Sequence, residues 1–314
     1  MKPKILKKNK TIWLAGHRGL VGKSILSLLK KNQYNVIFKT SKQLDLRNFT
    51  KVKNFLKKNM PDQIIISAGN VGGILANKNE PINFYYDNLT IGNNIIKAAY
   101  ELKIKNLLYL GSSCIYPKNI KRKILESDLL KGELEKTNEA YALAKIACTK
   151  YCQFVNNNSK LNYKTVMPCN VYGPNDNFHS TNSHVMASLI KKFTNAKKLN
   201  KKNVVIWGTG LPKREFIFVD DLSRAILKII QKNFKEDIIN IGVGYDITIN
   251  DLAKKISKIL NYNGKIIHDK TKPDGTYRKL LDNSKITKLG WSPTIHLDEG
   301  ISKTIKWYKA NNNL

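Results

Sequence analysis

The residues most suggestive of chemistry are a tyrosine and a lysine four positions apart. Tyr141 and Lys145 lie in the segment NEAYALAKIA, whose alanines and spaced apolar residues predict a helix. A spacing of four places both side chains on one helix face. A neighbouring ammonium is expected to lower the pKa of the phenol, which would make Tyr141 a proton donor usable near neutral pH.

A second group of polar side chains occurs in GSSCIYPK, directly after the apolar run NLLYL at residues 106–110. That run has the length and composition of a buried strand, so Ser112 and Cys114 follow a strand end. A hydroxyl there can donate a hydrogen bond to a carbonyl, and a thiolate can act as a base. Cys114 could equally be a small packed residue.

Two histidines lie in the polar, turn-rich stretch VYGPNDNFHSTNSHVM. His179 and His184 both have a side chain whose ordinary pKa suits proton transfer near neutral pH. Their spacing alone does not choose between them, and either could be a purely structural loop residue.

Gly16, Gly19 and Gly22 form a glycine-rich turn, GHRGLVG, between a predicted strand and a predicted helix. Glycines at such a turn let the backbone approach a pyrophosphate, and the helix N-terminus offers unpaired N–H groups to it. The sequence therefore predicts a dinucleotide site.

The residues after the second predicted strand indicate which dinucleotide binds. An NAD site usually presents an acid there, whereas residues 39–42 are Lys, Thr, Ser and Lys. Arg18 and Lys42 could pair with a 2′-phosphate, which favours NADP(H) over NAD(H). The alternative is that these are solvated surface charges. Asp45 and Leu46 are expected to contact the adenine.

The elements that must position these residues alternate between strands and helices. This rhythm predicts an α/β fold, a Rossmann-type doubly wound parallel sheet with right-handed crossovers. The expected strands are at residues 11–15, 35–39, 63–70, 106–110 and 163–170, and the expected helices at 20–31, 52–59, 91–102 and 139–155.

The rhythm breaks after Asn170, and the remaining chain is less regular. We predict an NADP-binding Rossmann domain at residues 10–170 that also takes a segment near 215–243. Residues 171–214 and 244–314 are predicted to form a smaller C-terminal substrate-binding lobe. No fixed-period repeat is present.

The formal net charge of +32 would ordinarily suggest nucleic acid as a partner. Here lysine is spread along the whole chain, and no helix-turn-helix, zinc-finger or RNA-recognition signature accompanies it. No nucleic-acid partner is expected, although an RNA-binding protein with this fold stays an alternative. The excess positive charge favours a phosphorylated small-molecule substrate.

The four cysteines are not spaced as metal ligands, and Cys148 and Cys152 share one face of a predicted helix. Free thiols of this kind fit a reducing, cytoplasmic compartment, and no metal is expected. The basic start, MKPKILKKNKTIWLAG, is expected to be neither a secretory signal nor a membrane span.

The order of glycine turn, Ser112 and Tyr141-x-x-x-Lys145 resembles the extended short-chain dehydrogenase/reductase superfamily. Within it, the chain is most similar to epimerase/reductases of GDP-keto-sugars. The similar segments, which run from Ala15 to Asp282, are AGHRGLVG, VGGI, LGSSCIYPK, NEAYALAKIA, VMPCNVYGPNDNFH, NSHV, WGTGLPKREF, VDDL and KPDGTYRKLLD.

The resemblance implies roles for five residues. Tyr141 would protonate a carbonyl oxygen as hydride arrives, with Lys145 as its partner and Ser112 as a second hydrogen-bond donor. Cys114 and His184 would remove and return protons at carbons 3 and 5, which a 4-keto group acidifies. It is the resemblance that assigns this role to His184 rather than to His179.

The resemblance also implies binding residues. Lys192 and Arg214 would contact the GDP diphosphate, and Trp207 and Asp274 the nucleoside or sugar, although Trp207 could instead be a core aromatic. The basic residue expected after the second strand is Ser41 here, followed by Lys42. Implied cofactor contacts are Gly16, His17, Arg18, Gly19, Leu20, Val21, Gly22, Ser41, Lys42, Asp45, Leu46, Leu110, Gly111, Ser113, Lys145, Pro168, Asn170, Val171 and His184.

The implied activity is NADPH-dependent epimerisation and reduction of GDP-4-keto-6-deoxy-D-mannose. The alternative is a GDP-sugar reductase, or an epimerase at one centre, acting on a related GDP-hexose or GDP-heptose. Relatives of this fold commonly dimerise through a pair of helices, so a homodimer is expected.

Overall fold

A six-stranded parallel sheet forms the centre of the computed structural model, which describes residues 10–179, 183–232, 234–272 and 274–312. The strand order is β10-β5-β4-β3-β1-β2, and every neighbouring pair is parallel. The strands are β1 (Thr11–Ala15), β2 (Asn35–Ile37), β3 (Gln63–Ile66), β4 (Asn106–Leu110), β5 (Asn162–Pro168) and β10 (Ile238–Ile241).

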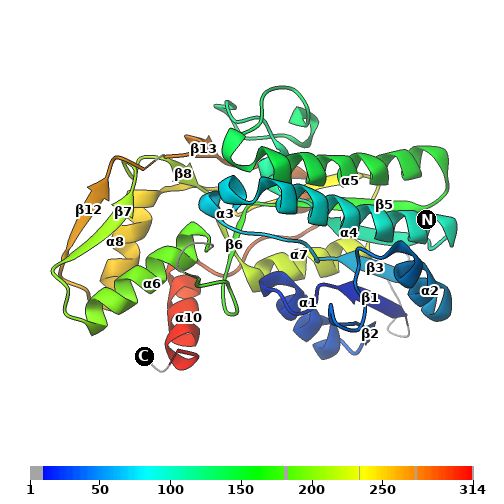
Figure 1. The fold of residues 1–314 in the computed structure, drawn as a ribbon, viewed down its shortest axis with the longest axis horizontal. Helices are drawn as coiled ribbons and strands as arrows, with labels where there is room; N and C mark the ends of the chain where they lie inside the picture. Colours follow the sequence, from blue (N-terminus) through cyan, green and yellow to red (C-terminus); the bar gives the residue numbers. More distant parts are fainter. Residues whose placement is uncertain (1–9, 180–182, 233, 273, 313–314) are drawn as a thin grey trace.

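Helices cover both faces of this sheet (Figure 1). They are α1 (Leu20–Lys31), α2 (Phe49–Asn59), α3 (Ile74–Asn79), α4 (Pro81–Glu101), α5 (Glu139–Asn158) and α7 (Val219–Gln231). Alternation along β1 divides the core: Ile12 and Leu14 pack on the side of α1 and α7, whereas Trp13 and Ala15 pack on the side of α2, α4 and α5. The expected Rossmann-type sheet is confirmed.

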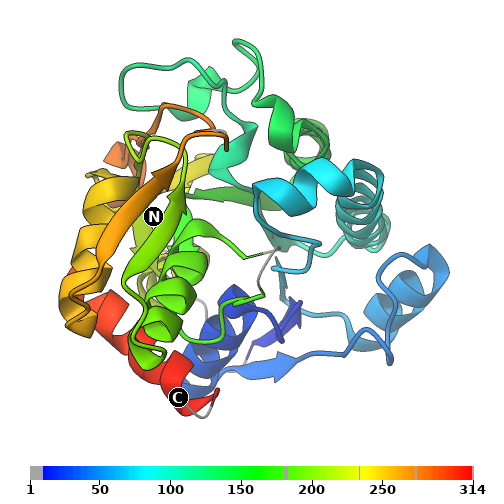
Figure 2. The same cartoon turned by 60° about the vertical axis from the view of Figure 1, so that its left-hand side comes forward.

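Segments from the second half of the chain build a further layer with its own apolar core, which contains Phe193, Ile256 and Ile301. Figure 2 shows α6, β7, α8 and β12 gathered on one side of the molecule. The second half of the chain, apart from α7 and β10, contains β6 (Asn170–Tyr172), α6 (Val185–Lys198), β7 (Asn203–Trp207), β8 (Lys213–Arg214), β9 (Phe216–Phe218), β11 (Ile247–Thr248), α8 (Ile249–Leu260), β12 (Lys265–Asp269), β13 (Arg278–Lys279), α9 (Ser284–Lys288) and α10 (Leu297–Ala310). Of these, α9 packs on β10 and its Ile286 belongs to the core of the central sheet.

Short pairings and turns complete the fold. β7 pairs with β12, β6 with β9, and β8 with both β11 and β13. Three single-turn 3-10 helices lie before α5, namely η1 (Ser113–Ile115), η2 (Glu126–Asp128) and η3 (Lys136–Asn138). Residues 1–9, on which the expectation about the basic N-terminal stretch mostly depends, lie outside the described residues.

Some boundaries differ from those expected. α4 begins at Pro81, ten residues before the expected start at 91, because proline is well suited to the first turn of a helix. β3 ends at Ile66 rather than at Asn70, and the chain from Ser67 leaves the sheet toward the cleft described below. Strand β12 and helix α3 were not expected from the sequence.

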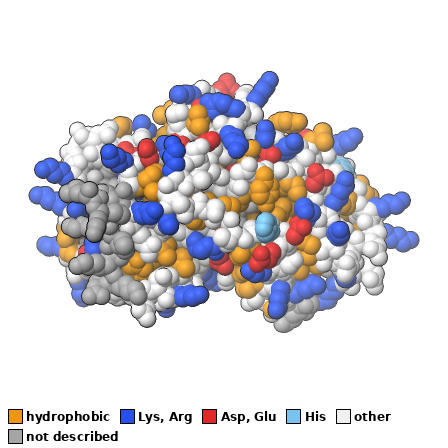
Figure 3. Space-filling view, turned by 180° about the vertical axis from the view of Figure 1, so that it is seen from behind, with side chains coloured by type: hydrophobic (Ala, Val, Ile, Leu, Met, Phe, Trp, Pro, Cys, Tyr) orange, Lys and Arg blue, Asp and Glu red, His pale blue; other side chains and the backbone are white. Residues whose placement is uncertain are grey.

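The basic side chains are dispersed in the folded molecule. On the face shown in Figure 3, Lys and Arg side chains are scattered over the surface and interspersed with acidic and apolar ones. Within the described part of the chain, no helix is long and apolar enough to cross a membrane.

Candidate active site

A large cleft, about 1160 Å³ in volume, runs along the carboxyl ends of the central strands and between them and the second layer. The order in which successive strands join the sheet reverses between β1 and β3, and ligands of open α/β sheets bind at such a point. Every site residue predicted from the sequence lines this cleft, from the glycine turn to Asp274. Their individual roles stay predictions.

The glycine turn forms one end of the cleft, at the N-terminus of α1. Gly16 has a positive φ of 92°, and a Cβ there would collide with the backbone of Ala68. A Cβ on Gly22 would collide with the carbonyl of Gly16. The turn can therefore be this tight only with glycine, and it leaves the first N–H groups of α1 facing the cleft.

The predicted 2′-phosphate residues lie at the same end. Arg18, Ser41 and Lys42 are exposed side chains that line the cleft, together with Lys39. His17 packs against Phe38 with ring centroids 4.5 Å apart, and burial, followed by the charge of Arg18, lowers the pKa of His17. Positive charge is thus available where a phosphorylated ribose is expected.

Ser112 and Cys114 lie on the tight turn after β4. The Cys114 backbone N–H donates to Ser112 Oγ at 3.2 Å, with Ser112 capping η1. Asn138 Nδ2 lies 3.4 Å from Cys114 Sγ and donates to it. Cys114 is half-buried, whereas Cys148, Cys152 and Cys169 are buried. The competing reading of Cys114 as a packed core residue therefore does not fit its exposure.

Tyr141 and Lys145 share one face of α5, as their spacing predicts. Lys145 Nζ lies 5.7 Å from the centre of the Tyr141 ring and 4.7 Å from that of Tyr109, and it donates to the Leu110 carbonyl at 2.9 Å. Burial lowers the pKa of Lys145 to about 8. The ammonium is thus held by the strand end rather than by the phenol.

The expected lowering of the Tyr141 pKa is wrong for this structure. Burial raises the pKa of Tyr141, nearby Cys114 raises it further, and a hydrogen bond with Ser112 opposes the shift only in part. Lys145 does not offset this because its Nζ donates to Leu110 and lies over the Tyr109 ring. The phenol therefore stays protonated at neutral pH, which is the form that donates a proton.

His184 lies at the N-terminus of α6 and lines the cleft, whereas His179 is not among the described residues that line it. His184 as a residue is exposed to solvent, but the surrounding protein desolvates its ring and lowers its pKa. A neutral imidazole can accept a proton. The geometry thus favours His184 over His179 as the histidine available to a ligand.

The predicted substrate residues lie on the second layer. Lys192 Nζ is 5.5 Å from the Trp207 ring centre and donates to the Val205 carbonyl at 2.9 Å. Trp207 is 41% exposed, which excludes the alternative of a core aromatic. Asp274 already accepts two hydrogen bonds from Thr209, at 2.7 and 2.8 Å. Burial lowers the pKa of Arg214, and Cys114, Glu135 and Asp274 counteract that shift.

Several cleft residues were not singled out from the sequence. They are polar or charged side chains without a diagnostic local pattern, and they include Arg47, Asp87, Glu135, Asn138, Asp176 and Lys279. Asn138 was within reach of sequence reasoning because it precedes Tyr141 by three residues. The described residues contain no group of three or more His, Cys, Asp or Glu side chains arranged to hold a metal ion.

The fold and this cleft define a nucleotide-binding enzyme of the α/β class. The model of the NAD dependent epimerase/dehydratase family matches residues 12–242, and the chain belongs to that family. GDP-L-fucose synthase 1 of Arabidopsis thaliana is 45% identical over 305 residues, which cover 97% of this chain and 94% of the relative. GDP-L-fucose synthase of Escherichia coli (strain K12) is 42% identical, covering 96% and 97%.

Other relatives carry different names. GDP-L-colitose synthase of Yersinia pseudotuberculosis is 44% identical over 96% of this chain and 99% of its own. A solved GDP-6-OMe-4-keto-L-xylo-heptose reductase from C. jejuni has a TM-score of 0.91 at 32% identity, covering 98% and 100%. A GDP-L-fucose synthetase from Naegleria fowleri, solved bound to NADP, has a TM-score of 0.88 at 28% identity, covering 99% and 97%.

Proposed function

We propose that this protein is an NADPH-dependent epimerase/reductase that converts GDP-4-keto-6-deoxy-D-mannose to GDP-L-fucose. The observation that carries the proposal is the meeting of Ser112, Cys114, Tyr141 and His184 in the same cleft as the glycine turn. Relatives named GDP-L-fucose synthase at 42–45% identity over nearly the whole chain support it.

The epimerisation uses the acidity of the carbons beside the 4-keto group. Cys114, as the thiolate, takes a proton from one of these carbons, and the electron pair moves onto the keto oxygen. Asn138 Nδ2, at 3.4 Å from the sulfur, stabilises the thiolate by donating to it. His184, which burial keeps neutral until it takes up a proton from water, then delivers that proton to the opposite face of the carbon as the electron pair returns from the keto oxygen. This step inverts the centre and leaves the imidazole neutral again.

The reduction uses the same carbonyl. Ser112 donates a hydrogen bond to the keto oxygen. Tyr141 transfers its phenolic proton to that oxygen, so the keto group becomes a hydroxyl as the carbon receives the hydride. The raised pKa of Tyr141 keeps its proton in place until that step. Bound NADP(H) supplies the hydride, and the glycine turn, Arg18, Ser41 and Lys42 are the residues that would hold its phosphates.

The test is proton exchange without reduction. The protein is incubated with GDP-4-keto-6-deoxy-D-mannose in D₂O without NADPH, and deuterium at carbons 3 and 5 is followed by NMR or mass spectrometry. We expect deuterium at both carbons, and a product with inverted centres after NADPH is added. Absence of exchange would exclude the two-step reaction.

A second candidate is a reductase, or a one-centre epimerase, for a related GDP-keto-sugar. The similarity to a GDP-L-colitose synthase and to a heptose reductase favours keeping it. A plain reductase has no need of the Cys114 and His184 pair. Exchange at a single carbon, or reduction without exchange, would point to this candidate.

We also propose a cytoplasmic homodimer. The outer surfaces of α4 and α5, which pack side by side, carry exposed apolar side chains at Tyr85, Tyr86, Leu143 and Phe154. Apolar surface of this kind is typical of protein interfaces. Sedimentation analysis should give twice the chain mass of 35.8 kDa, and a monomer at micromolar concentration would contradict the proposal.

A further inference from the structure

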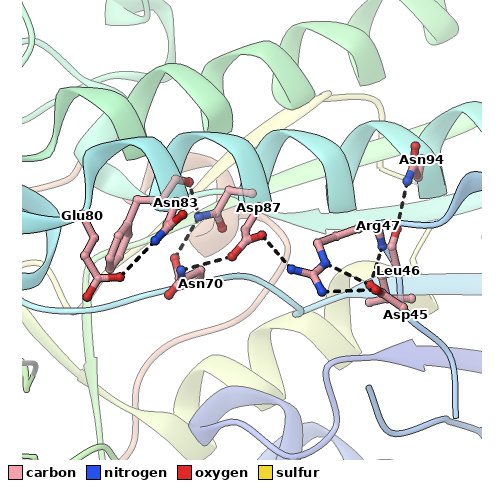
Figure 4. Close-up of polar contacts among 10 residues, drawn as sticks. Asp45, Leu46, Arg47, Asn70, Glu80, Asn83, Asp87 and Asn94 are labelled. Carbon is pink, nitrogen blue, oxygen red and sulfur yellow. Dashed lines mark hydrogen bonds and ion pairs between the residues drawn. The ribbon is translucent and has the colours of Figure 1, made fainter. Parts of the chain in front are cut away.

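Arg47 lies between two carboxylates in the wall of the cleft (Figure 4), next to Asp45 and Leu46, which are expected to contact the adenine. Its Nε and Nη2 lie 3.1 and 3.2 Å from the two oxygens of Asp45, and its Nη1 lies 3.4 Å from Asp87 Oδ1. The Arg47 backbone N–H also donates to Asp45 at 3.0 Å. The side-chain hydrogen bond from Arg47 is the main cause that lowers the pKa of Asp45, so that carboxylate is ionised at neutral pH.

This cluster is part of a chain of polar contacts along α4. Asn70 Nδ2 donates to the second oxygen of Asp87 at 3.3 Å, and Asn88 Nδ2 donates to the Asn70 carbonyl at 2.8 Å. At the other end, Asn94 Nδ2 donates to the Leu46 carbonyl at 3.0 Å. α4 therefore fastens both the turn at residues 45–47 and the segment that follows β3, and both of these line the cleft.

The charges of the cluster do not balance. Asp45 and Asp87 contribute two negative charges and Arg47 one positive charge, so the three side chains carry a net charge of −1. In the open cleft these groups contact water, since the Arg47 and Asp45 side chains are 52% and 44% exposed. A ligand that fills the cleft excludes that water and strengthens the electrostatic interactions around it.

We propose that Arg47 determines specificity for the phosphorylated cofactor by compensating Asp45 and Asp87, rather than by binding the 2′-phosphate itself. Its Nε, Nη1 and Nη2 are already engaged with the two carboxylates. Without Arg47, two uncompensated carboxylates would share the cleft wall with a ligand that carries additional phosphate charge. The inference rests on NADP(H) as the cofactor of the proposed function.

The proposal predicts an order of cofactor preference from cluster charge alone. The charge is −2 in Arg47→Met, −1 in the parent and in the Arg47→Met/Asp87→Asn double variant, and 0 in Asp87→Asn. The ratio of the NADH dissociation constant to that of NADPH should follow the same order. We expect Arg47→Met to lower it about fivefold at low salt, and Asp87→Asn to raise it.

The measurement is a titration of the full-length protein with NADPH and with NADH, in which binding is detected by calorimetry or by nucleotide fluorescence. The matched control is Asn83→Ala, which removes the contact of Asn83 with Glu80 at 3.3 Å on the same helix, outside the cleft. It should keep the parent ratio. Higher salt should narrow the difference between the variants because it screens the charges.

Three outcomes would overturn the inference. If Arg47→Met weakened the binding of NADPH and of NADH equally, Arg47 would have only a structural role. Failure of Asp87→Asn to restore NADPH preference in the Arg47→Met background would instead indicate direct contact of Arg47 with the 2′-phosphate. If Arg47→Met does not fold, as judged by circular dichroism, an unchanged ratio in the single variant Asp87→Asn decides against the proposal. A parent that binds neither cofactor would instead reject the cofactor assignment.

Discussion

At the scale of single residues, the proposed reduction depends on the phenolic proton of Tyr141. Tyr141→Phe removes the donor and keeps the ring in the same packing, including its edge contact with Phe84 at 6.5 Å. We expect the rate of keto reduction to fall by about 10²- to 10⁴-fold, the range for a lost general acid. Deuterium exchange without NADPH should survive in part, because Cys114 and His184 are unchanged.

Measuring NADPH oxidation in parallel with the deuterium-exchange assay distinguishes the effect on reduction from the effect on epimerisation. A Tyr141→Phe variant that lost exchange and reduction together would show that the phenol also serves epimerisation, contrary to the assignment.

Cys114 is predicted to serve only the epimerisation. Cys114→Ser replaces the thiol by a hydroxyl, a much weaker acid that is not ionised near neutral pH. Deuterium exchange should therefore fall by at least about 10²-fold. Reduction of an already epimerised intermediate should continue, since Ser112 and Tyr141 are intact. If both steps were unchanged in this variant, the thiol would be structural.

At the scale of elements, α4 packs closely against α5 at Gly92. A Cβ on Gly92 would collide with Cys148 Sγ on α5 and would lie 3.5 Å from the Tyr109 ring. Gly92→Ala should therefore lower the free energy of unfolding by about 1–3 kcal/mol through overpacking, even though alanine is the better helix former. Urea unfolding followed by circular dichroism measures this difference.

The double variant provides the control. Cys148→Ala removes the sulfur that the new methyl group would meet, so Gly92→Ala should cost less in that background. Equal costs in both backgrounds would show that the contact between α4 and α5 is not the cause.

At the scale of the whole molecule, Glu215 connects the two layers. Its fully buried carboxylate accepts backbone N–H groups from Val243, Gly244 and Leu281 at 2.6, 2.7 and 2.9 Å, and its own carbonyl accepts from Asn170. Glu215 directly follows Arg214 in the cleft wall. Burial raises the pKa of Glu215 to about 7, against the lowering effect of these three hydrogen bonds.

This raised pKa predicts a dependence of stability on pH. The folded protein binds the Glu215 proton more tightly than the unfolded chain, so this contribution is complete below about pH 4.5 and is lost as pH rises through 7. Glu215→Gln removes the titration. We expect the free energy of unfolding of the parent to decline relative to the variant by about 2–3 kcal/mol between pH 5 and 8.

Urea unfolding at several pH values gives both curves. Glu299→Gln, which removes a surface carboxylate paired with Lys303, is the control and should leave the pH profile of the parent unchanged. Parallel curves for the parent and Glu215→Gln would contradict the prediction.

The alternating strands and helices, the glycine turn and the shared face of Tyr141 and Lys145 were predictable from the sequence, because each depends on spacing within one or two adjacent elements. The late start expected for α4 was wrong because apolar periodicity alone did not register the proline that begins it. The preference for His184 over His179 came from the resemblance rather than from spacing.

Only the tertiary structure decided what burial and long-range contacts do to these groups. Lys145 donates to the Leu110 carbonyl, so burial is the main influence on the pKa of Tyr141 and raises it. Arg47 donates to Asp87, which lies 40 positions away in the sequence. Trp207 is exposed in the cleft rather than packed in a core. Spacing fixes which residues share a helix face or a turn, whereas desolvation and charge depend on every element that surrounds a group, and these elements come together only in the folded chain.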